Sequence, residues 1–225
     1  MKPKIFAARI HNLLIEFFGE PTWRPHLSPV AELISTILSQ NTNDQNRDLA
    51  FDRLRERFPT WEEVRDAPEE AVIEAIRPAG LANQKGPRLQ KALQYISETQ
   101  GSLTLDFLQD KTVSEARQWL ESIHGVGPKT ATIVLLFALN KPAFPVDTHV
   151  HRVTGRLGLL PVKMSADKAH NFLAEQFEPE TFYPVHLNLI RLGREICKAR
   201  SPRCPDCPLQ EVCSYYENEY QTDLD

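Results

Sequence analysis

Apolar residues recur at three- and four-residue intervals along most of the chain, and alternation with a period of two is hard to find. This spacing places apolar side chains on one face of an α-helix, whereas a half-buried strand alternates apolar and polar positions. In the stretch 27–40, for example, Val30, Leu33 and Ile37 fall on one helical stripe. The pattern therefore predicts an all-α fold.

Residues typical of helix ends predict where individual helices begin and stop. A side-chain oxygen at the N-cap can accept a hydrogen bond from a free backbone N–H, and glycine suits the left-handed position after a helix. The predicted starts are Ser28 before Pro29, Asp44, and the capping boxes Thr60–Glu63 and Thr112–Glu115. A helix from about Gly86 is expected to end at Gly101, and further helices are expected near 166–177 and 181–197.

The composition indicates an ordinary globular protein, since 41% of the 225 residues are hydrophobic and 25% are charged. No apolar run approaches the roughly 20 residues that cross a bilayer. Near the start of the chain Arg9, His11 and Asn12 interrupt the apolar positions, where a secretory segment would be continuous. We therefore expect a cytosolic protein with no membrane span.

The formal net charge of −4 gives no global electrostatic argument for nucleic-acid binding. The distribution of charge is more informative than the sum. Near the C-terminus Glu195 is the one acid among five basic residues, namely Arg191, Arg194, Lys198, Arg200 and Arg203. Such a cluster indicates either a limited anion-binding face or a solvated helix surface.

All four cysteines lie in one short segment, Cys197, Cys204, Cys207 and Cys213, with the spacing C-x6-C-x2-C-x5-C. In a reducing compartment such clustering favours metal ligation over disulfides. Zinc sites usually use two short chelating pairs, but only Cys204 and Cys207 form one here. The uneven spacing favours an iron–sulfur cluster, with zinc or simple buried thiols as the alternatives.

The segment HGVGPKTA, residues 124–131, lies between two helix-like stretches and predicts a helical hairpin. Its two glycines can adopt positive φ, and Pro128 suits the first position of the second helix. Free amides of Val126, Gly127 and Lys129 at the helix N-terminus would form a phosphate seat. A glycine hairpin without any function is the alternative.

Two residues are candidates for reaction chemistry. Lys129 falls in the first turn of the predicted helix, where the helix dipole together with burial would lower its pKa and favour a neutral amine. Asp147 precedes another predicted helix, so it is either a simple N-cap or a carboxylate that takes a proton or stabilises positive charge.

Taken together, GVGPKTA, VDTHVHRV and the cysteine run resemble the endonuclease III family of DNA glycosylases, within the helix-hairpin-helix superfamily. The resemblance implies two helical domains flanking a cleft. Residues 21–135 would form a six-helix barrel that carries the hairpin. Residues 1–20 and 136–225 would form a discontinuous domain with a [4Fe-4S] cluster.

Matched residue by residue, the resemblance makes Lys129 the catalytic lysine, Asp147 the catalytic aspartate and the four cysteines the cluster ligands. Carbonyls of Glu121, Ile123 and Val126 match positions that can hold a monovalent cation beside DNA. The remaining expected DNA contacts are Gly125, Val126, Gly127 and Thr130 in the hairpin and Lys198, Arg200 and Arg203 in the cysteine loop.

Two further segments resemble the family's duplex-probing loops. The segment Ser39–Asp44 matches the loop whose amide side chain fills the gap left by a flipped nucleotide, with Thr42 as a further expected contact. Asn41 stands where the family usually has glutamine, beside Gln40, so the sequence leaves open which of them inserts. Leu81 matches the apolar wedge. Without the resemblance, Asn41 would be a helix C-cap and Leu81 a core leucine.

The activity implied by the resemblance is that of a bifunctional glycosylase and AP lyase. It would act as a cytoplasmic, nucleoid-associated monomer of bacterial or archaeal type, on duplex DNA with damaged bases, expected to be oxidised pyrimidines, or with abasic sites. The alternatives are a mismatch-specific glycosylase for adenine, uracil or thymine, and a non-catalytic hairpin DNA-binding module. An adenine-specific relative usually lacks lysine at the position of Lys129.

Overall fold

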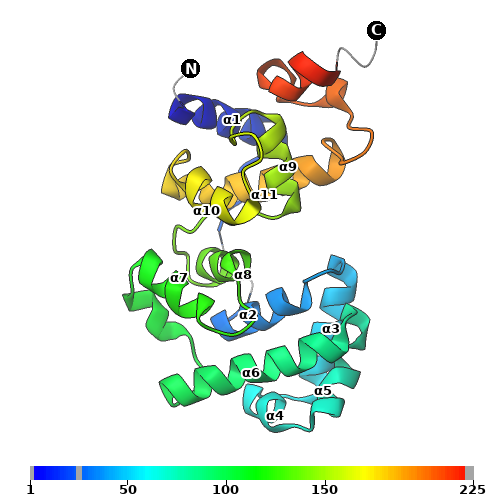
Figure 1. The fold of residues 1–225 in the computed structure, drawn as a ribbon, viewed down its shortest axis with the longest axis vertical. Helices are drawn as coiled ribbons and strands as arrows, with labels where there is room; N and C mark the ends of the chain where they lie inside the picture. The colour runs from blue at the N-terminus through cyan, green and yellow to red at the C-terminus, as the bar shows by residue number, and fades with distance from the viewer. Residues whose placement is uncertain (1–2, 24–26, 221–225) are drawn as a thin grey trace. The chain divides into compact units, whose positions relative to one another are not determined.

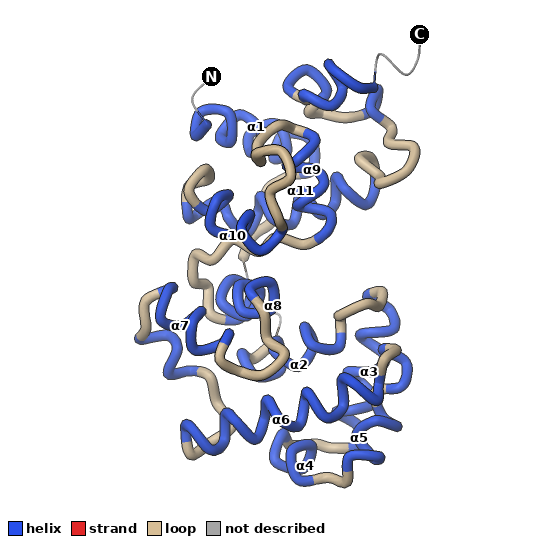
Figure 2. The backbone as a smooth tube through the Cα atoms, viewed as in Figure 1, coloured by secondary structure: helices blue, strands red, loops and turns tan. Residues whose placement is uncertain are grey.

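A computed structural model describes residues 3–23 and 27–220 of the chain (Figure 1). Within these ranges every regular element is helical and none is a strand (Figure 2). The all-α prediction is therefore confirmed. In the described residues no helix combines the length and the apolar character that crossing a bilayer requires.

The chain divides into two compact units. One, called here the hairpin unit, comprises Pro25–Lys141, and the other, the cysteine unit, comprises Met1–Arg24 with Pro142–Asp225. The expected domain boundaries at residues 21 and 135 remain predictions. Contacts divide the chain into compact units, but they do not show that either unit folds by itself.

The hairpin unit is built around the long helix α6 (Ala82–Gln100), which packs against α2 (Pro29–Leu38), α4 (Trp61–Asp66) and α5 (Glu69–Ala75). Its core is formed by fully buried leucine and isoleucine side chains such as Leu33, Ile37 and Leu93. The barrel arrangement expected for this unit stays a prediction. The other elements of the unit are α3 (Asp44–Arg57), η1 (Arg77–Ala79), η2 (Asp106–Asp110), α7 (Val113–Glu121), α8 (Pro128–Ile133) and η3 (Val134–Ala138).

The cysteine unit is built around α11 (Phe182–Glu195), which packs against α9 (Thr148–Arg156) and the N-terminal helix α1 (Pro3–Phe18). Its core includes Phe144, whose ring stacks on Phe177 and meets Phe182 edge-on at centroid distances of 5.4 and 5.2 Å. The remaining elements are α10 (Ala166–Ala174), η4 (Pro179–Thr181), η5 (Cys204–Asp206), η6 (Gln210–Val212) and η7 (Tyr216–Tyr220).

The helix ends match most of the sequence expectations. Both capping boxes form, at Thr60–Glu63 and Thr112–Glu115, and Gly101 ends α6 with a φ of 71°. The expectation for Asp44 is wrong, since Asn43 is the N-cap and its Oδ1 accepts from the Asn46 amide at 2.9 Å. Both are N-cap residue types, so sequence alone could not choose between neighbours.

Helix α6 starts at Ala82, earlier than the expected Gly86, with Pro87 inside the helix. A start at Gly86 would place Pro87 in the first turn, where proline costs least, whereas in the structure Pro87 lies more than one turn into the helix. The earlier start brings Lys85 into the helix and buries it. α10 also ends earlier than expected, at Ala174.

Candidate active site

The predicted hairpin is present and joins α7 to α8. Gly125 has a φ of +83°, whereas Gly127 is extended, with φ −100° and ψ −179°. Only Gly125 therefore uses the left-handed freedom that the sequence suggested for both glycines. The Val126 amide is not a free donor either, because it donates to the Ile123 carbonyl at 3.0 Å. This corrects the expectation that Val126 contributes its amide to a phosphate seat.

The left-handed turn at Gly125 lies directly against Arg88 of α6. A Cβ atom added at Gly125 would overlap this side chain and come within 2.6 Å of its Nε. Arg88 also donates from Nη1 to Oε1 of Gln40 at 2.6 Å. One arginine thus connects the hairpin to the Ser39–Asp44 loop, a connection that the sequence analysis missed.

Replacing Gly125 with alanine should destabilise the protein by about 1–3 kcal/mol, because a left-handed non-glycine residue costs about 1–2 kcal/mol and the new methyl overlaps Arg88. Gly127→Ala is the matched control. Its backbone is extended and no atom lies within 4 Å of its added Cβ, so its free energy of unfolding should change little. Urea unfolding measures both variants, and equal losses would contradict this account of the turn.

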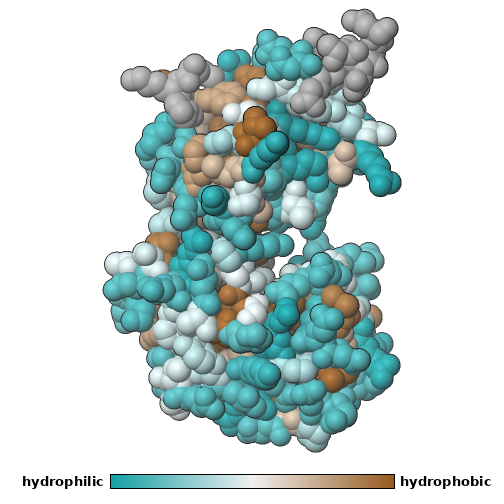
Figure 3. Space-filling view, in the orientation of Figure 1, coloured by the Kyte–Doolittle hydropathy of each residue, from teal (hydrophilic) through white to brown (hydrophobic). Residues whose placement is uncertain are grey.

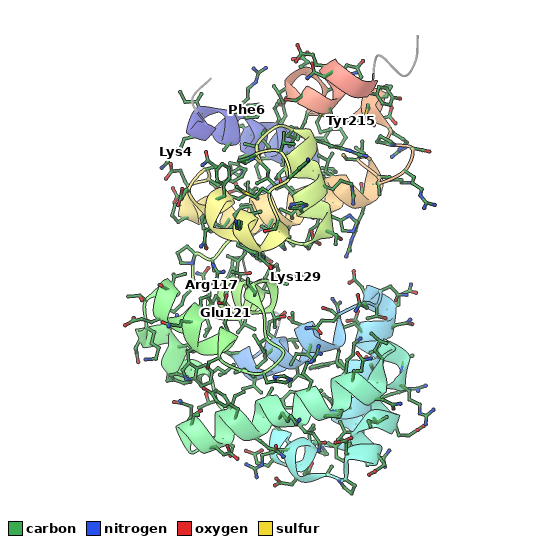
Figure 4. All side chains as sticks on the ribbon, in the orientation of Figure 1. Lys4, Phe6, Arg117, Glu121, Lys129 and Tyr215 are labelled. Carbon is green, nitrogen blue, oxygen red and sulfur yellow. The ribbon has the colours of Figure 1, made fainter. Side chains whose placement is uncertain are left out.

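Lys129 lies in the first turn of α8, directly after the hairpin, as expected (Figure 4). Its side chain is exposed, so the expectation that protein burial surrounds the amine is wrong. The reason is its place at the open end of the helix, where neighbouring turns do not cover it. The next residue, Thr130, is only 4% exposed, so any contact that it makes with DNA would use its backbone rather than its hydroxyl.

The carbonyls expected to hold a cation belong to the end of α7 and the turn. The Ile123 carbonyl already accepts the Val126 amide, and the Glu121 carboxylate accepts from Arg117 Nε at 2.6 Å. A carbonyl oxygen has a second lone pair, so the first bond leaves room for a cation. The cation site stays a prediction.

Asp147 is the N-cap of α9 in the cysteine unit. Its Oδ1 accepts from the Val150 amide at 2.7 Å, and the side chain is half-buried. Two buried histidines fix the preceding segment: the Val146 amide donates to His170 Nδ1 at 3.1 Å, and His186 Nδ1 donates to the Pro145 carbonyl at 3.0 Å. The capping role is therefore confirmed, and the carboxylate retains a second oxygen that the cap does not use.

The two expected probing residues share an unusual backbone. Asn41 and Leu81 are exposed and have positive φ angles of 54° and 50°. A core position for Leu81 is excluded, because 47% of the residue is exposed. The surface in Figure 3 is largely hydrophilic, and Leu81 belongs to the small set of exposed large apolar residues in the described part of the chain.

Left-handed backbone at residues other than glycine costs free energy and is concentrated at functional loops. Asn41 and Leu81 therefore fit a recognition role better than a packing role. Gln40 is the less available amide, since its Oε1 is already bonded to Arg88. Thr42, the other residue expected in this loop, is half-buried.

The four cysteines surround one cavity, together with Arg156, Tyr215 and other residues of the cysteine unit. Burial raises the pKa of the Cys207 thiol to about 12 and also raises those of Cys204 and Cys213. In the described residues no group of three His, Cys, Asp or Glu side chains converges closely enough for a single metal ion. Thiols around a cavity fit a cluster, which is larger than one ion, better than zinc.

Arginines of α9 hold the beginning of this cysteine loop. Arg156 donates from Nη1 to Cys197 Sγ at 3.3 Å and to the Lys198 carbonyl at 2.7 Å. Arg152 donates from Nε to the Cys197 carbonyl at 3.1 Å. Since Asp147 caps the other end of α9, one short helix connects the candidate aspartate to the cysteine loop.

The basic face near the C-terminus is partly neutralised by its own neighbours. Arg191 pairs with Glu195 at 2.9 Å, and Arg203 pairs with Asp206 at 3.6 Å. Lys198 and Arg200 are exposed, and among the described residues neither forms an ion pair. These two are therefore the stronger candidates for phosphate contacts, and Arg203 is the weaker one.

Comparison with known proteins decides the family. Residues 34–179 match the model of the HhH-GPD superfamily base excision DNA repair proteins, and residues 197–213 match the iron–sulfur binding domain of endonuclease III. The chain is 34% identical to endonuclease III of Sulfolobus acidocaldarius over 188 residues, which are 83% of this chain and 82% of that protein. The chain belongs to the endonuclease III family.

Further relatives agree with this assignment. The chain is also 34% identical to endonuclease III of Thermotoga maritima over 188 residues, which are 84% of this chain and 84% of that protein. A solved non-covalent endonuclease III–DNA complex has a TM-score of 0.82 at 28% identity, with 98% of this chain and 99% of that chain covered. A trapped covalent endonuclease III–DNA intermediate has a TM-score of 0.83 at 29% identity, with both chains fully covered at 100%.

As a member of the endonuclease III family, the chain is a bifunctional base excision repair enzyme that binds DNA and acts as a glycosylase and AP lyase. The expected [4Fe-4S] cofactor is confirmed by the iron–sulfur domain, whose matched residues begin and end at Cys197 and Cys213. The four thiols that line one cavity are the ligand set that such a cluster needs. When bound, the cluster supplies covalent cross-links that fix the loop.

Replacing Cys204 with alanine should remove the cluster, since four thiolates are needed to hold it. Purified wild-type protein should be yellow-brown with a broad absorbance near roughly 400 nm, and the variant should lose this band and most of its iron. Absorbance and metal analysis of anaerobically prepared protein measure the effect. Stoichiometric zinc without iron in the wild-type protein would contradict the cluster assignment.

Proposed function

We propose that this enzyme removes oxidised pyrimidine bases from duplex DNA, with Lys129 as the nucleophile and Asp147 as its charged partner in the reaction. The observation that carries the proposal is the position of Lys129, an exposed amine in the first turn of α8 directly after the glycine turn. Because the Lys129 side chain is exposed, DNA can reach the amine without displacing any protein segment.

The glycosidic bond of a base inside a duplex is not accessible, so the target nucleotide must leave the helix, at a cost of a few kcal/mol. We assign Asn41 to the gap that the nucleotide leaves and Leu81 to the opposite strand as a wedge. Their exposure and left-handed backbone support this assignment. Gln40 would support the loop through Arg88 rather than insert.

In the proposed reaction the neutral Lys129 amine bonds to C1′ of the sugar while the bond between C1′ and the base nitrogen breaks. The base leaves with the bonding pair and takes up a proton. Asp147 helps to remove the proton from the attacking amine and stabilises the positive charge that develops at the sugar. The nitrogen lone pair then forms the C1′=N bond of a Schiff base while the C1′–O4′ bond of the sugar breaks and O4′ takes up a proton. Loss of a C2′ proton from this Schiff base expels the 3′ phosphate by β-elimination.

Binding of the flanking phosphates would be shared between the two units. In the hairpin unit the amides of Gly127 and Lys129 are the proposed donors, because the Val126 amide is used inside the turn. In the cysteine unit Lys198 and Arg200 are the proposed basic contacts. We also propose that the enzyme acts as a monomer on nucleoid DNA in the cytoplasm.

A panel of duplexes that each carry one lesion tests the proposed substrate. Oxidised pyrimidines should be released faster than uracil, mismatched thymine or mismatched adenine, and strand cleavage should accompany release. Base release without strand cleavage would favour a mismatch-specific glycosylase. Binding without either reaction would favour a non-catalytic hairpin module and would overturn the assignment of Lys129.

A further inference from the structure

Lys85 is a buried lysine that the proposed reaction does not use. It lies on α6, and only 2% of the residue is exposed. Its Nζ donates to the Leu38 carbonyl at 2.8 Å and to the Ala79 carbonyl, also at 2.8 Å. These partners are far from each other in sequence, so one ammonium group joins two separate segments of the hairpin unit.

Both carbonyls are at the C-terminal ends of helical elements. Leu38 is the last residue of α2, and Ala79 is the last residue of η1. The final carbonyls of a helix have no partner within the helix, and the negative end of its dipole attracts a cation. Lys85 therefore satisfies two acceptors that burial would otherwise leave unpaired.

The chain continues from each of these carbonyls directly into one probing loop. Ser39 and Gln40 lead from Leu38 to Asn41, and Gly80 leads from Ala79 to Leu81. Gly80, Leu81 and Asn41 all have positive φ. The Lys85 ammonium is thus bonded to the backbone at the point where each exposed, left-handed segment begins.

A buried lysine without an acidic partner is expensive. Burial lowers its pKa to about 8, and within the described residues both hydrogen-bond partners are neutral carbonyls and no ion pair forms. An apolar residue would avoid the cost of desolvating the charge, but it could not join the two carbonyls. The geometry indicates a task for these two bonds beyond filling the core.

Arg88, one turn later on α6, extends the same support. It holds the Gln40 side chain and packs against Gly125 of the hairpin. Helix α6 therefore contacts the Ser39–Asp44 loop (the Asn41 loop), the Gly80–Leu81 segment (the Leu81 loop) and the turn that precedes Lys129. A rigid helix is well suited to keep such elements at fixed positions.

We propose that Lys85 is a positioning residue that holds the Asn41 and Leu81 loops in a fixed relation, so that both can enter a duplex on either side of a flipped nucleotide. The inference rests on the proposed function, since it requires these two residues to probe the duplex. It predicts that Lys85 matters where a duplex must be opened and does not matter where the sugar is already accessible.

The test compares borohydride trapping of the holoenzyme on an abasic site in duplex DNA with trapping on the same site in single-stranded DNA. Lys85→Met keeps a long side chain but loses both donors. We expect its trapping rate on duplex DNA to fall by about 10²-fold, the effect of a misplacement of about 1 Å, and its rate on single-stranded DNA to stay within about twofold. Lys91→Met, an exposed lysine on the same helix, is the matched control and should change neither rate.

If Lys85→Met does not fold, Lys85→Arg decides the question. It keeps the charge and several donors, but its planar fork cannot reproduce the ammonium geometry, so the ratio of duplex to single-strand rates should fall by about tenfold. The inference is overturned if the variant that folds has the wild-type ratio of duplex to single-strand rates. Unchanged rates would show that Lys85 has no positioning role, and equal losses on both substrates would indicate general damage to the protein. Failure of the proposed function is distinct: the wild-type enzyme itself would then trap neither substrate.

Discussion

Lys129→Gln should lose both strand cleavage and borohydride trapping while it still binds damaged duplex DNA. An amide cannot form a Schiff base, so the covalent path has no substitute in this variant. The fall in rate should be roughly 10⁴-fold or more, as for other enzymes that lose a covalent nucleophile. Binding should persist because the glycine turn and the start of α8 do not depend on the lysine side chain.

Single-turnover cleavage of a duplex with one oxidised pyrimidine measures this effect, with a filter-binding assay for affinity. Lys91→Gln is the control, since it removes an exposed lysine outside the hairpin. If Lys129→Gln cleaves and traps at the wild-type rate, another amine is the nucleophile. Lys129 would then be a lysine that contacts phosphate.

Asp147→Asn should slow base release by roughly 10²- to 10⁴-fold, the usual contribution of a positioned acid or base. Asparagine can still accept the hydrogen bond from the Val150 amide that caps α9, so the fold and the affinity for DNA should change little. The variant lacks only the negative charge that the proposed mechanism assigns to Asp147.

Asp147→Ala separates the two roles of this residue. Alanine removes the cap as well as the charge and should cost about 1 kcal/mol of stability, whereas Asp147→Asn should cost much less. Chemical unfolding of both variants beside their single-turnover rates distinguishes the effects. A wild-type rate of base release in Asp147→Asn would reduce Asp147 to a structural cap.

The sequence predicted the fold class because helix periodicity and capping residues are local signals. The boxes at Thr60–Glu63 and Thr112–Glu115 form as expected, and the turn before Pro128 starts α8 as expected. The errors arose where local signals were ambiguous. Asn43 and Asp44 are equally good caps, and α6 begins at Ala82, about one turn before the expected Gly86.

The candidate residues could be named from sequence, but their surroundings could not. Lys129 was expected to be buried and is exposed, because burial depends on which distant segments cover a helix end. The choice between Gln40 and Asn41 depends on Arg88, which is distant in sequence from both. Lys85 gave no sequence signal, since a lysine that bonds two helix ends has the same letter as a solvated one.

The most direct test of the central claim is to locate the covalent bond between the wild-type enzyme and DNA. The borohydride-reduced complex with a damaged duplex is digested with protease and nuclease, and the modified peptide is sequenced by mass spectrometry. The reduced sugar remnant should be on Lys129, in the peptide that contains Gly127 and Pro128. A remnant on any other lysine, or the absence of a trapped complex, would contradict the proposed mechanism.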